Sequence, residues 1–277
     1  MVDAESAKWA LYAYLTNHFT LFSLPRTLSN SLETIFSVVA LSYFPWSRDD
    51  DASDGDVRSA LAKHVIWAAL TVVVRPTAII TWIPLWLPRV FSRKIDAVDK
   101  RRFCLLLIRV AFFAVVASVI LDSYCYGEFT FVPWEFLKIN VFHGVASFYG
   151  SHPFHWYFSQ GFPVILGPHL LPFIGALRLI WKLKFAPRVD RALQQYREMQ
   201  RKKEQKHRSN DSGVKERNPD EGNASEVDSG RELLLLKIIF WILVIYSLLG
   251  HKEFRFIFTT LPLAMCLVGK YVASLDG

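Results

Sequence analysis

The chain has 277 residues, of which 52% are hydrophobic and 21% are charged, and its formal net charge is +7. Soluble domains contain about 45–50% apolar residues, and that share includes their glycines. The composition therefore excludes intrinsic disorder and collagen, and three cysteines, an odd number, exclude a disulfide scaffold. The apolar residues lie in blocks between short charged stretches. This pattern favours a polytopic membrane protein over a soluble helical core.

Seven apolar blocks predict an all-α membrane protein. A membrane-crossing helix needs about 20 mainly apolar residues. The first two blocks, residues 9–24 and 32–44, are shorter than this and are expected to be tilted or partly embedded. The five remaining blocks are residues 65–87, 103–121, 161–181, 233–249 and 254–272. Together, the seven blocks predict six or seven spans, with eight as the upper limit.

The distribution of basic residues predicts the orientation. Residues 89–102 contain six basic and two acidic residues, and residues 182–208 contain ten and three. Because Lys and Arg accumulate in cytosolic loops, both segments are expected to face the cytosol. Residues 122–160 contain one Lys and three acidic residues, which predicts a lumenal loop. The positive charge thus belongs to cytosolic loops and does not indicate nucleic-acid binding, although the run 201–208 could also touch anionic lipid headgroups.

Three regions are expected along the chain. Residues 1–197 form a transmembrane bundle that includes the lumenal loop, and residues 232–277 form a C-terminal transmembrane hairpin. Residues 198–231 have few apolar side chains and are expected to be a disordered, cytosolic insert. Two glycosylation sequons in this insert, at Asn210 and Asn223, are therefore expected to be unused.

Arg75 stands in the middle of an apolar block and is followed by Pro76. An arginine at bilayer depth lines a polar cavity or pairs with an anion, and proline can kink or split a helix. The block is either one kinked span or two helices with Arg75 at their lumenal turn. The acidic balance of residues 45–64 favours the kinked span. Arg75 is a candidate for binding a lipid-linked phosphate, and the alternative is a pair with a buried carboxylate.

The lumenal loop contains three His, two Trp, four Tyr and seven Phe in 39 residues. Trp and Tyr prefer the membrane interface, so short interfacial helices are expected here. Aromatic faces and His donors also suit a site that binds sugars. His152 and His155 lack a third ligand at convincing spacing, so no metal is expected.

Residues 250–256 (GHKEFRF) connect two apolar blocks, and four of the seven are ionisable. They could form an interfacial clamp. They could equally place Lys252 and Arg255 on an anionic group, with Glu253 orienting the two cations.

Five motifs, taken in chain order, resemble the dolichyl-phosphate-mannose-dependent mannosyltransferases of the endoplasmic reticulum: 29–34 (SNSLET), 75–77 (RPT), 122–127 (DSYCYG), 152–161 (HPFHWYFSQG) and 251–256 (HKEFRF). The run 148–167 most resembles members that act in GPI-anchor synthesis. The resemblance covers the chain except for the insert.

The resemblance implies part of a GT-C-type glycosyltransferase bundle, multi-pass in the endoplasmic reticulum membrane. It implies transfer of an α-1,2-linked third mannose from dolichyl phosphate mannose to the GPI precursor on the lumenal face, without a cofactor. An acidic general base would act on the acceptor hydroxyl while dolichyl phosphate leaves. The alternatives are a mannosyltransferase acting on the dolichol-linked oligosaccharide and a truncated, non-catalytic membrane subunit.

The resembling family carries its catalytic acid in a His-Pro-Asp-Glu-type motif of the first lumenal loop, which this sequence lacks. The chain is therefore expected to be a truncated isoform, a partial gene product or a fragment, and Asp122 is only a weak candidate for the base. Asn30 is expected to cap a helix in a capping box with Glu33. Substrate contacts are expected from nine residues: Arg75, His152, His155, Trp156, Gln160, His251, Lys252, Glu253 and Arg255.

Overall fold

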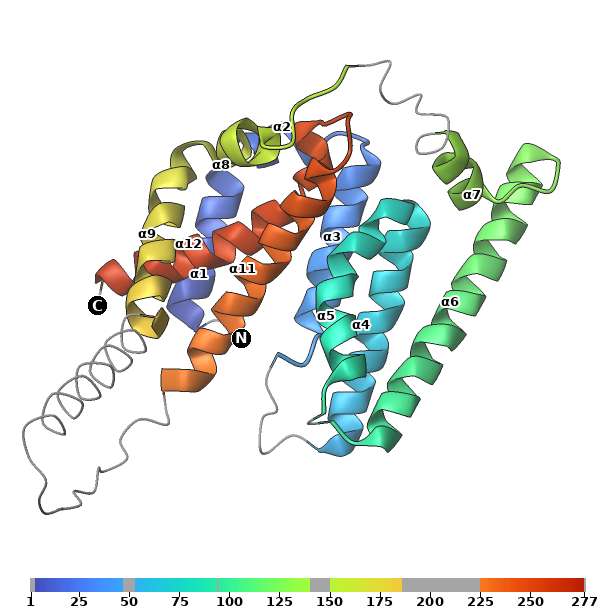
Figure 1. Ribbon diagram of the computed structural model, residues 1–277, viewed down its shortest axis with the longest axis horizontal. Coiled ribbons are helices and arrows are strands. Elements are labelled where there is room, and N and C mark those ends of the chain that lie inside the picture. Colours follow the sequence, from blue (N-terminus) through green and yellow to red (C-terminus); the bar gives the residue numbers. More distant parts are fainter. Residues whose placement is uncertain (1–2, 47–52, 94, 140–149, 186–224, 277) are drawn as a thin grey trace, which may run out of the picture.

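The computed structural model describes residues 3–46, 53–93, 95–139, 150–185 and 225–276 (Figure 1). Every regular element in these ranges is helical, with short 3₁₀ or π turns labelled η. The elements are α1 (Ala4–Thr16), α2 (His18–Ser23), α3 (Ser29–Ser42), α4 (Asp54–Val74), η1 (Pro76–Ala78), α5 (Ile79–Phe91), α6 (Ala97–Tyr126), α7 (Val132–Leu137), η4 (Tyr157–Gly161), α8 (Phe162–Leu166), η5 (Gly167–His169), α9 (Leu170–Ile180), η6 (Trp181–Phe185), α11 (Ser225–Ser247), η7 (Phe254–Ile257) and α12 (Thr260–Asp276).

Three described helical segments are long and apolar enough to cross a membrane: Asp54–Val74, Ala97–Tyr126 and Tyr157–Leu183. This supports the predicted polytopic membrane protein. The number is smaller than the six to eight spans expected from the sequence. One reason is that α12 has only 17 residues. Another is that the first apolar block is divided between α1 and α2.

Asn17 causes the division between α1 and α2. Its side-chain oxygen accepts hydrogen bonds from the backbone N–H groups of Phe19 and Thr20, which caps α2. Its side-chain nitrogen donates to the carbonyls of Ile165 and Leu166 at 3.0 and 3.1 Å. The same buried side chain therefore begins one helix and fixes it to the end of α8.

The block around Arg75 forms two helices, so the expectation of a single kinked span is wrong. The helix α4 ends at Val74, Arg75 is extended, and the chain returns through η1 into α5. Trp82 donates to the Thr71 hydroxyl, and Trp86 donates to Nε2 of His64. These pairings, at sequence separations of 11 and 22, require α4 and α5 to run antiparallel. Arg75 therefore lies at the turn.

The core is centred on α12, which packs on α1 and is flanked by α9 and α11. Gly269 of α12 lies against the backbone of α1, where an added Cβ would meet backbone atoms of Ser6 and Ala10. The absence of a side chain thus permits the close approach of the two helices. By contrast, α4 and α5 are the helices that α6 packs against most, and most apolar side chains of α6 are exposed.

One end of the bundle, called the apical end here, gathers the turn at Arg75, the start of α3 and the loop between α11 and α12. It is the upper end in Figure 1, where the C-terminal end of α6 and the short helix α7 also lie. The basic link between α5 and α6 and the end of α9 lie at the opposite end.

The predicted three-region organisation remains a prediction. The helix α11 begins at Ser225, so its first turns fall within the range 198–231 that is expected to be disordered. Residues 198–224, with both sequons, lie outside the described residues. Similarly, the first five residues of the predicted loop 122–160 belong to the end of α6.

Candidate functional site

Four segments that are distant in the sequence meet at the apical end: the start of α3, the Arg75 turn, residues 150–161 and the loop 249–256. Asn30 illustrates the distance, because its side-chain nitrogen donates to the carbonyl of Arg255 at 3.0 Å across 225 residues. Four of the five sequence motifs thus contribute to one cluster of polar and aromatic side chains, which we call the apical cluster.

Arg75 is held on three sides in the apical cluster. Its Nε donates to the Thr77 hydroxyl at 2.9 Å and lies 3.4 Å from Oε2 of Glu33. Its guanidinium carbon lies 5.0 Å from the ring centroid of Phe256, within the range of a cation–π contact. The Glu33 side chain is only 2% exposed and that of Arg75 is 12% exposed. The alternative that Arg75 pairs with a buried carboxylate is confirmed.

Glu33 has a different role from the predicted one. The N-cap of α3 is Leu28, without a side-chain cap, and Asn30 lies inside the helix and donates to Arg255. The predicted capping box of Asn30 and Glu33 is therefore wrong. The pattern Asn-x-x-Glu indicated a local contact, whereas both side chains make long-range contacts. The signal available in the sequence was an acidic residue within an apolar block, because such a group needs a charged partner when it is buried.

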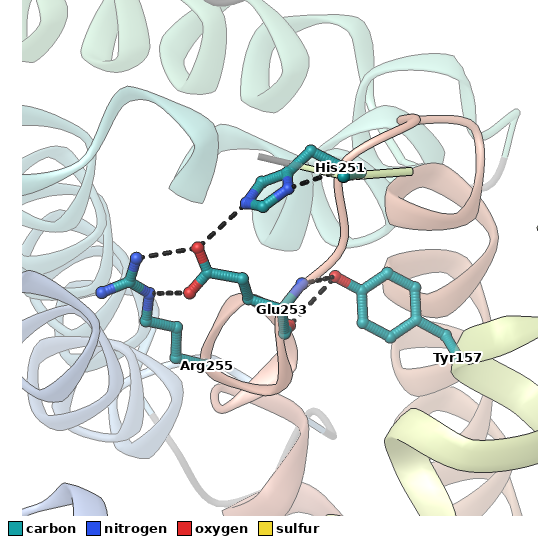
Figure 2. Close-up of polar contacts among 5 residues, drawn as sticks. Tyr157, His251, Glu253 and Arg255 are labelled. Atoms are coloured by element: carbon teal, nitrogen blue, oxygen red, sulfur yellow. Dashed lines mark hydrogen bonds and ion pairs between the residues drawn. The ribbon is translucent and has the colours of Figure 1, made fainter. Parts of the chain in front are cut away.

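Glu253 lies between His251 and Arg255 (Figure 2). Its carboxylate pairs with Arg255, and Oε1 lies 3.0 Å from Nε2 of His251. The other ring nitrogen of His251 faces the carbonyl of Gly150 at 3.2 Å. Both ring nitrogens of His251 thus face oxygen atoms, and the Glu253 carboxylate bridges His251 and Arg255.

The pKa of Glu253 reflects this arrangement. Partial burial raises the pKa, but the hydrogen bonds and charges of His251 and Arg255 outweigh it and hold the pKa below its usual value. Glu253 is therefore ionised at neutral pH and already saturated with donors. This suits it to orienting His251 and Arg255 and not to accepting a proton. The pair expected from the sequence was Lys252 and Arg255, of which only Arg255 contacts Glu253.

Tyr157 fixes the backbone of this loop. Its hydroxyl donates to the carbonyl of Glu253 at 3.1 Å and accepts from the N–H of the same residue at 3.2 Å (Figure 2). The ring of Tyr157 is fully buried and meets the ring of Tyr246 on α11 edge-on. Sequence reasoning did not select Tyr157, although it lies within the fourth motif.

Lys252 points inward. Its Nζ donates to the carbonyls of His152 and Leu249, and the residue is only 4% exposed. Burial lowers its pKa. Together with the bond from the His152 N–H to the Gly250 carbonyl, at 3.0 Å, Lys252 ties residues 150–152 to the loop. From the sequence, Lys252 was expected to contact substrate. In the structure, the Lys252 ammonium instead donates to backbone carbonyls.

Aromatic rings form one wall beside the loop. His152 stacks on Trp156 with ring centroids 4.7 Å apart, and Trp156 packs against Phe254 at 4.9 Å. Trp156 is buried, whereas His152, His155 and Gln160 are exposed. The wall therefore offers one exposed imidazole face with further polar side chains nearby.

Asp122 lies apart from the apical cluster. It is near the C-terminal end of α6, where it accepts a hydrogen bond from the Ser118 hydroxyl at 3.1 Å. In the ranges that the structure describes, no ion pair or hydrogen bond joins it to the cluster. Within the same ranges, no three His, Cys, Asp or Glu side chains gather closely enough to hold a metal ion.

Comparison with known proteins identifies related chains. The model of the Alg9-like mannosyltransferase family matches residues 2–276. GPI alpha-1,2-mannosyltransferase 3 of Homo sapiens is 34% identical over 96% of this chain and 38% of its own length. The Bos taurus protein of that name is 33% identical over 96% and 39%, and GPI mannosyltransferase 3 of Saccharomyces cerevisiae is 29% identical over 99% and 38%.

The chain spans about two fifths of the length of these curated relatives. No solved structure matches. The match to the family model extends over almost every residue, and the apical cluster is built from the motifs that carried the resemblance. The chain belongs to the Alg9-like mannosyltransferase family.

Proposed function

We propose that this chain acts in GPI-anchor biosynthesis as a mannosyltransferase, or as the part of one that binds its lipid-linked substrates. The reaction is the transfer of an α-1,2-linked third mannose from dolichyl phosphate mannose to the GPI precursor, on the lumenal face of the endoplasmic reticulum membrane. The observation that carries the proposal is the convergence of four motifs into the apical cluster. The names of the relatives point to the same reaction.

The cations of the cluster suit the phosphate of the donor. Guanidinium groups bind phosphate oxygens in a bidentate manner, and Arg75 and Arg255 lie 5.0 and 5.9 Å from the same Phe256 ring. Negative charge develops on dolichyl phosphate as it leaves the sugar. Fixed positive groups at that place stabilise the transition state. We assign Arg75, His251 and Arg255 to the phosphate, with Glu253 orienting the last two.

The aromatic wall suits the sugars. Mannose presents a weakly polar face that can lie against the stacked pair of His152 and Trp156. His155 and Gln160 are exposed beside it and can bond sugar hydroxyls. In this proposal Lys252 supports the wall through the backbone of His152 and does not touch the sugar.

An apolar groove can hold part of the donor's lipid tail. It has a volume of about 190 Å³, lies between α4, α5 and α6, and is closed above by Phe131 and Pro133. Its lining includes Val73 and Ile79, which flank the Arg75 turn in the sequence. A prenyl chain in the groove would thus enter the bilayer close to the phosphate site.

The general base is not assigned. Both carboxylates of the apical cluster, Glu33 and Glu253, are engaged in ion pairs. Asp122 is distant from them and remains a weak candidate. The cluster is therefore proposed to bind and orient substrates.

A complementation experiment tests the function. Cells that lack GPI alpha-1,2-mannosyltransferase 3 are expected to lose GPI-anchored proteins from their surface, and expression of this protein is expected to restore them. Arg255→Ala and His155→Ala are expected to abolish the restoration at equal protein level, and Ser274→Ala, at an exposed position on α12, is expected to leave it intact. Full restoration by both site variants would overturn the site assignment.

Analysis of the lipid-linked glycans separates the alternatives. Loss of the protein should leave a GPI precursor that stops at two mannoses. Shortened dolichol-linked oligosaccharides would instead indicate the other branch of lipid-linked mannosylation. Failure of the wild-type protein, at normal protein level, to restore any GPI-anchored protein in these cells would indicate a non-catalytic subunit.

A further inference from the structure

Thr77 determines which atoms of Arg75 remain available at the apical cluster. The guanidinium has five N–H donors in a fixed planar fork, one on Nε and two on each terminal nitrogen. The Nε–H donates to the Thr77 hydroxyl at 2.9 Å and faces Oε2 of Glu33 at 3.4 Å. Of the described residues, none accepts a hydrogen bond from Nη1 or Nη2 of Arg75. The two terminal nitrogens therefore form the open edge of the fork.

The orientation of the fork depends on Thr77 more than on Glu33. A charge-assisted hydrogen bond has a length of about 2.7–2.9 Å, which the contact with Thr77 meets and the contact with Glu33 exceeds. Glu33 thus supplies the negative charge that lets Arg75 be buried. Thr77 supplies the directional bond that sets the plane of the guanidinium, and the Phe256 ring covers one face.

The local backbone explains why residue 77 can do this. Arg75 is extended, with φ −150° and ψ 108°, and Pro76 begins the 3₁₀ turn that contains Thr77. The residue before a proline is biased to this extended region. The turn then brings the hydroxyl of residue 77 back to the Nε of residue 75.

We propose that Thr77 is a positioning residue that fixes the Arg75 guanidinium so that Nη1 and Nη2 together receive two oxygens of a lipid-linked phosphate. This rests on the proposed function, since it names the role of one residue within that same phosphate site. Thr77 itself does not touch the phosphate. Its effect on the phosphate is exerted through Arg75.

The test is binding of dolichyl phosphate to the protein in lipid nanodiscs, with Thr77→Val, Thr77→Ser and wild type compared. Valine retains the shape of threonine and removes only the hydroxyl, whereas serine retains the hydroxyl. Thr77→Val is expected to weaken binding of dolichyl phosphate about ten-fold. This corresponds to the lower end of the free energy that a hydrogen bond to a charged group contributes. Thr77→Ser is expected to bind within about two-fold of wild type.

A second background distinguishes positioning from a general effect on the fold. Lysine at position 75 keeps the charge beside Glu33 but has no fork for Thr77 to orient. In the Arg75→Lys background, Thr77→Val should therefore cause no additional loss of binding. An equal loss in both backgrounds, or wild-type binding by Thr77→Val, overturns the proposal.

A matched control and the wild type complete the design. Ser37 is a buried hydroxyl one turn further along the face of α3 that carries Glu33, and Ser37→Ala should bind as wild type does. If wild-type protein does not bind dolichyl phosphate, the proposed phosphate site fails and the role of Thr77 fails with it. If wild type binds and only the Thr77 comparison fails, the proposed function stands without this residue.

Discussion

At the scale of single residues, the apical cluster depends on two carboxylates that have different tasks. Glu33 is buried and neutralises Arg75, so that a guanidinium can remain inside a helical bundle. Glu253 is partly exposed and holds His251 and Arg255 together. The first pair is therefore expected to dominate the stability of the fold, and the second is expected to respond to pH.

Removing one member of the buried pair should be worse than removing both. Arg75→Gln leaves the Glu33 charge without a partner and is expected to lower the free energy of unfolding by about 3–5 kcal/mol. The double variant with Glu33→Gln should recover most of this loss, because no buried charge is left. Denaturant unfolding in detergent measures both values. Additive losses in the double variant would show that the two residues do not interact.

The Glu253 pair should give a specific acid sensitivity. Its folded pKa lies below the usual value, so its contribution to stability is complete above the unfolded pKa and is lost as the pH falls through the folded pKa. Between about pH 5 and pH 3 the melting temperature of wild type should fall more than that of Glu253→Gln. Glu135→Gln, which removes an exposed carboxylate paired with Lys138, is the control and should follow wild type. Parallel curves for wild type and Glu253→Gln would contradict the ion-pair geometry.

At the scale of elements, the antiparallel pair α4 and α5 and the long helix α6 together form the apolar groove. Small residues of α6, among them Ala111 and Ala114, line the groove together with Val65 and Ala69 of α4. If the groove holds the lipid tail of the donor, its volume should affect the binding of the donor and leave the rate of the chemical step unchanged.

Filling the groove should therefore act on binding. Ala114→Trp is expected to raise the KM for dolichyl phosphate mannose about ten-fold while kcat changes less than about two-fold, the pattern of lost uniform binding. Ala117→Trp places the same side chain at an exposed position of α6 outside the groove lining and should leave both constants unchanged. A mannosyl-transfer assay with varied donor concentration measures them. An unchanged KM for Ala114→Trp would place the lipid tail elsewhere.

At the scale of the whole molecule, the two ends of the bundle differ in charge and in content. The apical end contains the cluster and the aromatic segment around α7, and the opposite end contains the basic link between α5 and α6 (Figure 1). The positive-inside rule then predicts that the apical end faces the lumen. Because α4 ends at the Arg75 turn, its start at Asp54 lies toward the opposite end, which is expected to face the cytosol.

Labelling of sealed microsomes tests the orientation. Cys125 is exposed near the apical end, and it should react with a membrane-impermeant maleimide only after the membrane is opened. A cysteine introduced at Asp99, near the start of α6, should react in sealed vesicles. The reverse order of reaction, or a glycosidase-sensitive mass shift at Asn210 or Asn223, would invert the orientation.

Much of the site was predictable from the sequence because it depends on residue types and their order. The aromatic segment, the ionisable run 250–256 and Arg75 in an apolar block are visible without a structure, and each was a candidate for a site beside a purely structural alternative. Tyr157 and Thr77 were not selected, because a tyrosine or threonine beside apolar residues has no unusual local signature. Their importance comes only from the partners that the fold brings to them.

Sequence alone determined the class of protein, since apolar blocks and basic loops follow from the requirements of a bilayer and need no knowledge of packing. Only the tertiary structure decided that Arg75 lies at a helical turn, that Glu33 is its partner and that Lys252 points inward. These features depend on contacts between residues distant in the sequence, such as the bond from Lys252 to the carbonyl of His152 across 100 residues. Local patterns such as an N-cap motif carry no information about such contacts, because burial and pairing are properties of neighbouring helices.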